Sequence, residues 1–426
     1  MLSTMGIIFL FSMALGIPIA FCLGITAAIA LIKLDAPLRV VAQRIFTGID
    51  SFPLMAVPFF VLAGDLMNRG GTTLRLVRFS NTLVGWIRGG LAHTNIVASM
   101  FLAGISGSAV ADAAAIGSIL IPGMTREGYD LDFSAAVTAS ASTMGPIIPP
   151  SIFMVIYGVT TGVSIGALFA AGLIPGVLIG FSFMTIAYII SRKRNYPKHP
   201  RPLLLEIWQA LRKAAFALLA PVIILGGILL GVFTPTEAAA IAVGYAFLVG
   251  ILVHRELSLK DLPSILIQSG TTTSILLLII GTANVLAWVL SAEQVPQHIA
   301  QMLLTITHNP YLIMLLINLF LLAVGMFMEG GAAIIIIAPV LSQVAQAVGI
   351  HPLHFGFTMV LNIVIGLLTP PLGVCLFVVC GIARVPLPRL VRAVFPFLMV
   401  EIGVLFLVSY FPMIALYIPR LLGYLK

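Results

Sequence analysis

The chain has 426 residues, of which 60% are hydrophobic and only 8% are charged, whereas roughly 25% are charged in a typical soluble domain. Apolar runs long enough to cross a bilayer recur from end to end, and no polar stretch is long enough to fold as a soluble domain. The net charge of +8 gathers mainly in one loop, so it does not indicate nucleic-acid binding. Composition therefore predicts a single all-α integral membrane domain over residues 1–426.

The first 32 residues are apolar but lack a basic start, which favours a membrane helix over a cleaved signal peptide. Further along, residues 69–88 carry four arginines and no acid, which predicts a cytoplasmic position. One face of this stretch is apolar, as in a helix that lies along the membrane surface. That face consists of Leu76, Phe79, Leu83 and Trp86. A frayed extension of a spanning helix is the alternative.

Two short apolar limbs, 91–103 and 113–125, flank a glycine- and serine-rich tip at 104–112. Each limb has 13 residues, or roughly 20 Å of helix against a hydrocarbon core of about 30 Å, which favours a re-entrant hairpin over two spans. Residues 310–349 contain a second such hairpin with its tip at 325–331. Non-helical backbone at membrane depth needs cover from protein or from a water-filled cavity. Both tips are therefore predicted to lie inside the protein.

An interrupted membrane helix is predicted after each hairpin, at 141–151 and at 362–373, because each segment contains adjacent prolines. Proline removes a backbone donor and clashes with the preceding turn, so adjacent prolines free carbonyl groups near the bilayer middle. Free carbonyls together with Ser, Thr and Asn oxygens suit a hard cation, and the positive ends of the half-helices suit an anion.

The loops predict the orientation of the chain. Residues 192–213 carry seven basic residues against one glutamate, which is the strongest cytoplasmic signal. Residues 291–309 have no Lys or Arg and are predicted to face outside, although they correspond to 69–88 in the other half. They too have an apolar helical face, made of Val295, Ile299, Met302 and Ile306. The two halves are therefore predicted to have opposite orientations.

Shifting the chain by 221 residues against itself aligns six special positions without a gap. The matched pairs are Gly104 with Gly325, Gly128 with Gly349, Gly145 with Gly366, Pro149-Pro150 with Pro370-Pro371, and Pro175 with Pro396. Together with the loop charges, this predicts an inverted repeat: about 1–192 and about 214–426, joined by the cytoplasmic loop 192–213. An inverted repeat around broken helices is typical of secondary transporters, whose binding site lies where the breaks meet.

Four motifs are similar to those in the large membrane subunit of tripartite ATP-independent periplasmic (TRAP) transporters. They are GISGSAVADAAAIG at 104–117, GPIIPPS at 145–151, FTPTEAAA at 233–240 and GLLTPPLG at 366–373. The resemblance covers essentially the whole chain. It implies an elevator-type sodium symporter for organic anions, often C4-dicarboxylates or sialic acids, in the bacterial inner membrane. It also implies a small four-helix membrane subunit, expected here as a separate chain, and a periplasmic substrate-binding protein.

The resemblance and the local chemistry point to the same candidate residues. The first sodium site would comprise Ser106, Gly107, Ser108, Ser142, Thr143 and Gly145. The second would comprise Gly325, Glu329, Gly330, Asn362, Gly366 and Thr369. The substrate-facing residues would be Pro149, Pro150, Ser151, Pro370, Pro371 and Gly373. No metal other than sodium is expected.

Asp112 and Glu329 are intramembrane acids, which are costly and usually functional, although Asp112 could instead brace its hairpin through hydrogen bonds. Glu237 follows Thr234-Pro-Thr and is expected to cap a helix N-terminus. An enzyme is not expected, because no conspicuous nucleophile or His/acid cluster is present. A stand-alone divalent-anion:sodium symporter that needs no binding protein remains the alternative. A channel is less expected, because two hairpins with matched helix interruptions are better suited to alternating access.

The predicted topology has nine full spans and two hairpins, with a cytoplasmic N-terminus and a periplasmic C-terminus. In a background without Cys22, Cys375 and Cys380, Gln297→Cys should react with an impermeant maleimide applied to intact cells, whereas Lys198→Cys should react only after lysis. The opposite labelling pattern would contradict the charge argument for the orientation.

Overall fold

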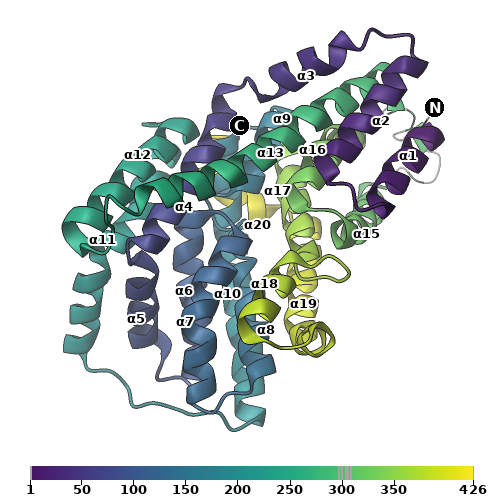
Figure 1. The fold of residues 1–426 in the computed structure, drawn as a ribbon. Coiled ribbons are helices and arrows are strands. Elements are labelled where there is room, and N and C mark those ends of the chain that lie inside the picture. The colour runs from purple at the N-terminus through teal and green to yellow at the C-terminus, as the bar shows by residue number, and fades with distance from the viewer. Residues whose placement is uncertain (1, 296–297, 299–300, 303–306, 308, 426) are drawn as a thin grey trace.

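The computed structural model describes residues 2–295, 298, 301–302, 307 and 309–425, and these residues contain helices and no strand (Figure 1). The helices of the first half are α1 (Leu2–Ala14), α2 (Ile19–Lys33), α3 (Arg39–Ile49), the 3₁₀ turn η1 (Phe52–Met55), α4 (Ala56–Arg69), α5 (Thr72–Val84), α6 (Gly90–Ser106), α7 (Ala109–Arg126), α8 (Leu131–Ser142), α9 (Ile152–Thr161) and α10 (Ile165–Lys193). Those of the second half are α11 (Leu204–Leu229), α12 (Pro235–Leu248), the π-helical η2 (Val249–His254), α13 (Leu262–Ala292), α15 (Pro310–Phe327), α16 (Gly330–Ala347), α17 (Pro352–Gly366), α18 (Val374–Ala383), α19 (Leu387–Tyr410) and α20 (Met413–Leu421).

Seven helices of the described residues are long and apolar enough to cross a membrane, or eight if the bent pair of α3 with η1 and α4 is one span. This is fewer than the nine full spans predicted from the sequence. One reason is that α8, α9, α17 and α18 are pieces of 10 to 15 residues on either side of the predicted interruptions. The chain is therefore a multi-pass membrane protein in which several helices stop inside the molecule.

The two limbs of the first hairpin are longer than predicted. Helix α6 has 17 residues and α7 has 18, not 13, because α6 continues through the glycine at position 104 and ends only at Gly107. Gly107 has φ +62°, in the left-handed region that terminates helices, and Ser108 then caps α7. Helices α15 and α16 have 18 residues each, so both reach the length of a short span.

Helix α13, with 31 residues, crosses the molecule obliquely (Figure 1). Along its length it contacts α2, α3, α4 and α16. At 1.5 Å per residue it is about 46 Å long, more than the thickness of the hydrocarbon core. It therefore forms a long wall against which segments from both halves of the chain pack.

Helix α5 is a separate helix between Gly71, which has φ +77°, and Gly85, so it is not a frayed extension of a span. Its apolar face, including the buried Leu76 and Phe79, packs on α6 and α11. Its position along the membrane surface remains a prediction. Half of the corresponding apolar face in the other half of the chain, namely Ile299 and Ile306, lies outside the described residues.

The basic loop after α10 is tied to the turn between α7 and α8. Arg194 Nη1 donates to Asp130 Oδ2 at 2.7 Å, and the Tyr196 hydroxyl donates to the same oxygen at 2.7 Å. These two donors lower the pKa of Asp130, with the Tyr196 hydrogen bond the larger cause. His199 and Glu127 approach within 2.9 Å. The ends of α7, α8 and α10 therefore lie together on one side of the molecule.

Glu237 caps α12 as the sequence predicted. Its Oε2 accepts a hydrogen bond from the Thr234 backbone N–H at 2.8 Å, and its own N–H donates to Thr234 Oγ1 at 3.3 Å. This reciprocal pair is a capping box, which satisfies two N–H groups of the first helical turn.

Two glycines let the second hairpin contact the second interruption. A Cβ added to Gly366 would lie 2.5 Å from the Gly325 carbonyl oxygen, and one added to Gly325 would lie 3.2 Å from Gly366 Cα. Both contacts are to backbone, which cannot move aside as a flexible side chain can. Helices α15 and α17 therefore approach each other as closely as their main chains allow.

Gly366→Ala should lower the stability of the protein, because overpacking typically costs about 1–3 kcal/mol, more than the helix propensity that alanine gains. The control is Gly403→Ala in α19, where an added Cβ meets nothing within 4 Å. Thermal unfolding in detergent should show a lower midpoint for Gly366→Ala and an unchanged or higher one for Gly403→Ala. Equal midpoints would contradict the close approach of α15 and α17.

Candidate functional site

The first hairpin tip is organised around a buried carboxylate. Asp112 is fully buried, and its Oδ1 accepts a very short hydrogen bond from Ser106 Oγ. Its Oδ2 has no hydrogen-bond partner among the described residues. The backbone N–H of Ser108 donates to Ser106 Oγ at 3.3 Å, so Ser106 also braces the turn. Asp112 therefore braces its hairpin through Oδ1, as one of its two expected roles requires. Its Oδ2 remains without a hydrogen-bond partner among the described residues.

The first interruption, between α8 and α9, packs directly on this tip. A Cβ on Gly145 would lie 2.7 Å from Asp112 Oδ2 and 3.0 Å from the Ser108 carbonyl carbon. A Cβ on Gly107 would lie 2.8 Å from the Pro150 carbonyl oxygen. Ser151 Oγ donates to the Pro146 carbonyl at 2.5 Å and caps α9. The tip and the interruption therefore contact each other, and two glycines make the contact possible.

A second buried acid, Glu401 of α19, stands behind the first interruption. Thr143 Oγ1 lies 2.9 Å from Glu401 Oε1 and 2.7 Å from the Ser140 carbonyl oxygen. Glu401 is fully buried, and its Oε2 has no partner among the described residues. Glu401 was not predicted from the sequence, although the rule that intramembrane acids are usually functional would have identified it in the apolar α19 segment.

The second tip and the second interruption also contact each other. The Leu372 N–H donates to the Met326 carbonyl at 3.0 Å, which joins the interruption to the end of α15. Glu329 is the N-cap of α16, with Oε1 accepting from the Gly331 N–H and Oε2 from the Ala332 N–H, both at 2.9 Å. Glu329 thus balances the positive end of the α16 dipole.

Asn362 is held from the side of α15. Its Nδ2 donates to the backbone carbonyl of Asn318 and to Asn318 Oδ1, both at 3.0 Å. Its buried Oδ1 has no partner among the described residues. Thr369 Oγ1 donates back to the Ile365 carbonyl at 2.9 Å. The Pro149–Pro150 and Pro370–Pro371 peptide bonds are both cis.

A cavity of about 370 Å³ lies between the two tips and is here named the central cavity. Of the predicted sodium-site residues, Ser106, Gly107, Ser108 and Glu329 line it. The six residues predicted to face substrate do not belong to its described lining, but their neighbours Pro146, Ile152, Leu367 and Val374 do. The remaining lining comes from Val61, Gly64 and Asp65 of α4, Ala109, Val110, Ala111 and Ala114 of α7, Phe153 of α9, and Gln268, Thr272 and Leu276 of α13.

Four helices begin at the central cavity. Its lining includes the first residues of α7, α9 and α18, which are Ala109, Ile152 and Val374, and Glu329, the N-cap of α16. Each helix N-terminus carries roughly half a positive charge, which Glu329 balances at the start of α16. The described lining contains two carboxylates, Asp65 and Glu329, and no Lys, Arg or His. The only positive potential that this lining provides is therefore that of helix dipoles and backbone N–H groups.

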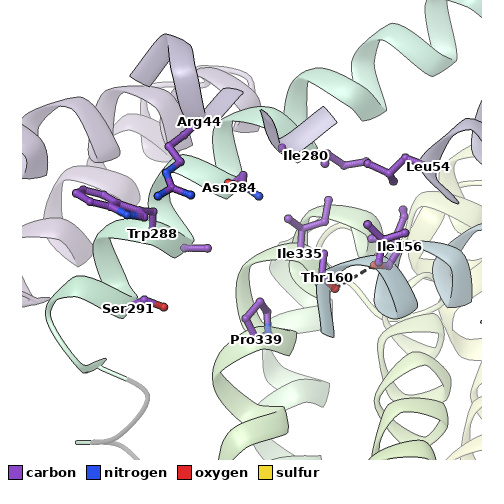
Figure 2. Close-up of a pocket in the computed structure, with 13 residues that line it drawn as sticks. Arg44, Leu54, Ile156, Thr160, Ile280, Asn284, Trp288, Ser291, Ile335 and Pro339 are labelled. Carbon is purple, nitrogen blue, oxygen red and sulfur yellow. Dashed lines mark hydrogen bonds between the residues drawn. The ribbon is translucent and has the colours of Figure 1, made fainter. Parts of the chain in front are cut away.

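Helix α13 lines the central cavity and two further cavities, one on each side of it along the helix. The Asp65 cavity, of about 360 Å³, shares Asp65, Ala111, Ala114 and Gln268 with the central cavity and also contains Arg69. The Arg44 cavity, of about 300 Å³, lies beyond Leu276 (Figure 2). The α13 residues that line the three cavities in turn are Ile265, Gln268, Thr272, Leu276, Ile280, Asn284, Ala287, Trp288 and Ser291. Apart from the adjacent pair Ala287 and Trp288, successive residues of this set are three or four positions apart, so they follow one side of the helix.

Comparison with known proteins decides the family. The family described as "Tripartite ATP-independent periplasmic transporter, DctM component" matches residues 6–414. The chain belongs to this family. It is 44% identical to the sialic acid TRAP transporter large permease protein SiaM of Vibrio cholerae, over 96% of each chain. It is 43% identical to the C4-dicarboxylate TRAP transporter large permease protein DctM of Pseudomonas aeruginosa, over 94% of each chain.

The solved structure of the Alcanivorax borkumensis YdaH transporter shares the fold, with a TM-score of 0.65 over 88% of each chain and 13% identity. The predicted TRAP family is therefore confirmed, and so is the prediction of a membrane transporter rather than an enzyme, since the relatives are named as permeases.

The α13 face predicts a pattern of chemical accessibility. In a background without the native cysteines, Gln268→Cys and Asn284→Cys should react quickly with a water-soluble thiosulfonate in membranes, because a thiol ionises only where water reaches it. Ile267→Cys and Leu278→Cys are matched controls, because these two side chains lie away from the cavity-lining positions of α13 and are 70% and 40% exposed. Similar rates at all four positions would show that the cavities do not admit water.

Proposed function

We propose that this TRAP permease imports an organic anion together with sodium ions. The observation that carries the proposal is the central cavity, where four helices begin and where the described lining has no basic side chain. The substrate class is a carboxylate such as a C4-dicarboxylate or sialic acid, which are the compounds in the names of two relatives.

The cavity offers an anion hydrogen-bond donors rather than a fixed cation. The residues that line it include possible donors in the backbone N–H groups at the helix starts, the Ser108 hydroxyl and the Gln268 amide. However, Asp65 and Glu329 repel an anion, and an unpaired charge is costly at this depth. A bound cation is therefore needed when the anion is present, and sodium suits the hard oxygen ligands that the chain supplies.

The first sodium site is proposed at the contact between the first tip and the first interruption. Its ligands would come from Ser106, Gly107, Ser108, Ser142, Thr143 and Gly145. Two observations support this location. The tip and the interruption are in backbone contact, and the buried Oδ2 of Asp112 lacks a partner among the described residues beside them.

The second sodium site is proposed at the corresponding contact in the other half. Its ligands would come from Gly325, Glu329, Gly330, Asn362, Gly366 and Thr369. The close approach of Gly325 and Gly366 and the unpartnered Oδ1 of Asn362 support it. Substrate contacts by Pro149, Pro150, Ser151, Pro370, Pro371 and Gly373 also remain a proposal, supported by neighbouring residues that line the central cavity.

We further propose the inverted repeat, the two re-entrant hairpins and an elevator-type movement. Gly145 and Gly366, which match at the offset of 221, each pack against the tip of their own half, although the residues that they meet do not correspond at this offset. Three cavities follow one face of α13, so a unit of hairpins and half-helices that slides along α13 would expose the central cavity to each side in turn. Alternating access by movement of one unit against another is general among repeat-built transporters.

The partners and the location follow from the family and are part of the proposal. A small four-helix membrane subunit and a periplasmic substrate-binding protein would complete the transporter in the bacterial inner membrane. The alternative is a stand-alone divalent-anion:sodium symporter that needs no binding protein. Strong uptake at micromolar substrate without any binding protein would support that alternative.

Sodium dependence tests the two sites. Ser108→Ala and Thr369→Ala should each raise the sodium concentration for half-maximal uptake into proteoliposomes, with milder effects at saturating sodium. The matched control is Thr185→Ala in α10, which removes a hydroxyl bonded to the carbonyl four residues earlier, as the Thr369 hydroxyl is. Unchanged sodium dependence in both site variants, or equal wild-type uptake in potassium without sodium, would contradict the assignment.

A further inference from the structure

The Arg44 cavity presents a guanidinium group that no acid among the described residues neutralises. Arg44 lies on α3, and its guanidinium carbon is 5.4 Å from the centre of the Trp288 ring on α13, a cation–π distance. Figure 2 shows this guanidinium beside Trp288 and Asn284, at the edge of the cavity. Arg44 forms no ion pair with any residue that the structure describes, and no Asp or Glu belongs to the described lining.

Neutral donors stand beside this charge. The Asn284 amide and the Ser291 hydroxyl line the cavity, and neither side chain makes a hydrogen bond to another described residue. A Cβ on Gly48, one turn after Arg44, would lie 2.7 Å from Asn284 Cβ. The glycine thus lets α3 and α13 approach closely enough to put the Arg44 and Asn284 side chains at one cavity. A guanidinium with nearby N–H and O–H donors and no acid is a carboxylate-binding arrangement.

We propose that the Arg44 cavity is an anion-binding site separate from the central cavity, with Arg44 as its charged anchor and Asn284 as a neutral donor. Its ligand is the carboxylate, or an equivalent oxyanion, of the transported compound. The proposal rests on the proposed function for its role in transport. The cavity lies at the Ser291 end of α13, where the chain enters the segment 291–309 that is predicted to face outside, so in this orientation it would hold the anion on the outer side, before the anion enters the central cavity.

The Arg44 cavity and the central cavity would bind the anion with different sources of positive charge. In the Arg44 cavity a side chain supplies the positive charge, so an anion can bind there before any sodium does. In the central cavity the charge must come from helix N-termini and from bound cations. Binding at the Arg44 cavity must be weak enough for release, as at any intermediate site on a transport path. Positive potential at the entrance also raises the local concentration of anions.

The Trp288 ring allows a direct test that does not depend on transport. The chain has three tryptophans, so Trp86→Phe with Trp208→Phe leaves Trp288 as the single emitter. Iodide, an anionic quencher, should quench Trp288 several-fold more strongly with Arg44 present than in Arg44→Gln, whereas neutral acrylamide should quench both equally. Millimolar succinate, N-acetylneuraminate or isethionate should protect Trp288 from iodide only when Arg44 is present. Equal iodide quenching in the two proteins would overturn the proposal.

Transport kinetics separate this proposal from the proposed function. Arg44→Gln should raise the half-saturating substrate concentration about tenfold, as expected for the loss of one charged hydrogen bond, and leave the sodium dependence unchanged. Arg44→Lys should retain part of the affinity, and Arg39→Gln on the same helix, outside the cavity lining, should behave as wild type. Wild-type uptake that does not need sodium would contradict the proposed function alone. Unchanged kinetics in Arg44→Gln would contradict the anion site alone.

Discussion

The architecture depends on covering backbone that is not helical at membrane depth. Two helices are interrupted, and the polar groups freed there must meet protein or a water-filled cavity. Each interruption packs on a hairpin tip through a glycine: Gly145 on the first tip and Gly366 on the second. The same contacts bring four helix N-termini to one cavity. The packing that satisfies the backbone polar groups therefore also gathers several helix N-termini at a cavity whose described lining has no basic side chain.

The distribution of charge follows from this arrangement. Helix N-termini attract an anion, but Asp65 and Glu329 line the same cavity and Asp112 is buried nearby. Fixed basic side chains occur instead in the flanking cavities, at Arg44 and Arg69. A dissociable sodium ion can neutralise the anion and then leave, which weakens anion binding when the sodium ion is released. In our account, coupling therefore follows from the absence of a basic residue in the described central lining.

Local signals in the sequence predicted the interruptions, the tips and the Glu237 cap, because glycine, proline and capping residues act on their own backbone. The cavity wall was not predicted. Gln268 and Thr272 lie in an apolar 31-residue helix with no local pattern that separates cavity-facing from lipid-facing positions. The limb length was wrong, because the glycine at position 104 continues the helix instead of ending it. The two proline pairs were predicted to face substrate. Tertiary packing decides which side chains reach the central cavity, and residues near the prolines line it.

The central claim is that sodium supplies the charge that holds the anion, and reciprocal binding tests it most directly. Isothermal titration of the detergent-purified permease should show that saturating sodium raises anion affinity, and that saturating anion raises sodium affinity by the same factor, as linkage requires. Asp65→Asn should reduce that factor, because less negative charge then needs compensation. Anion affinity that is identical in sodium and in potassium would contradict the account.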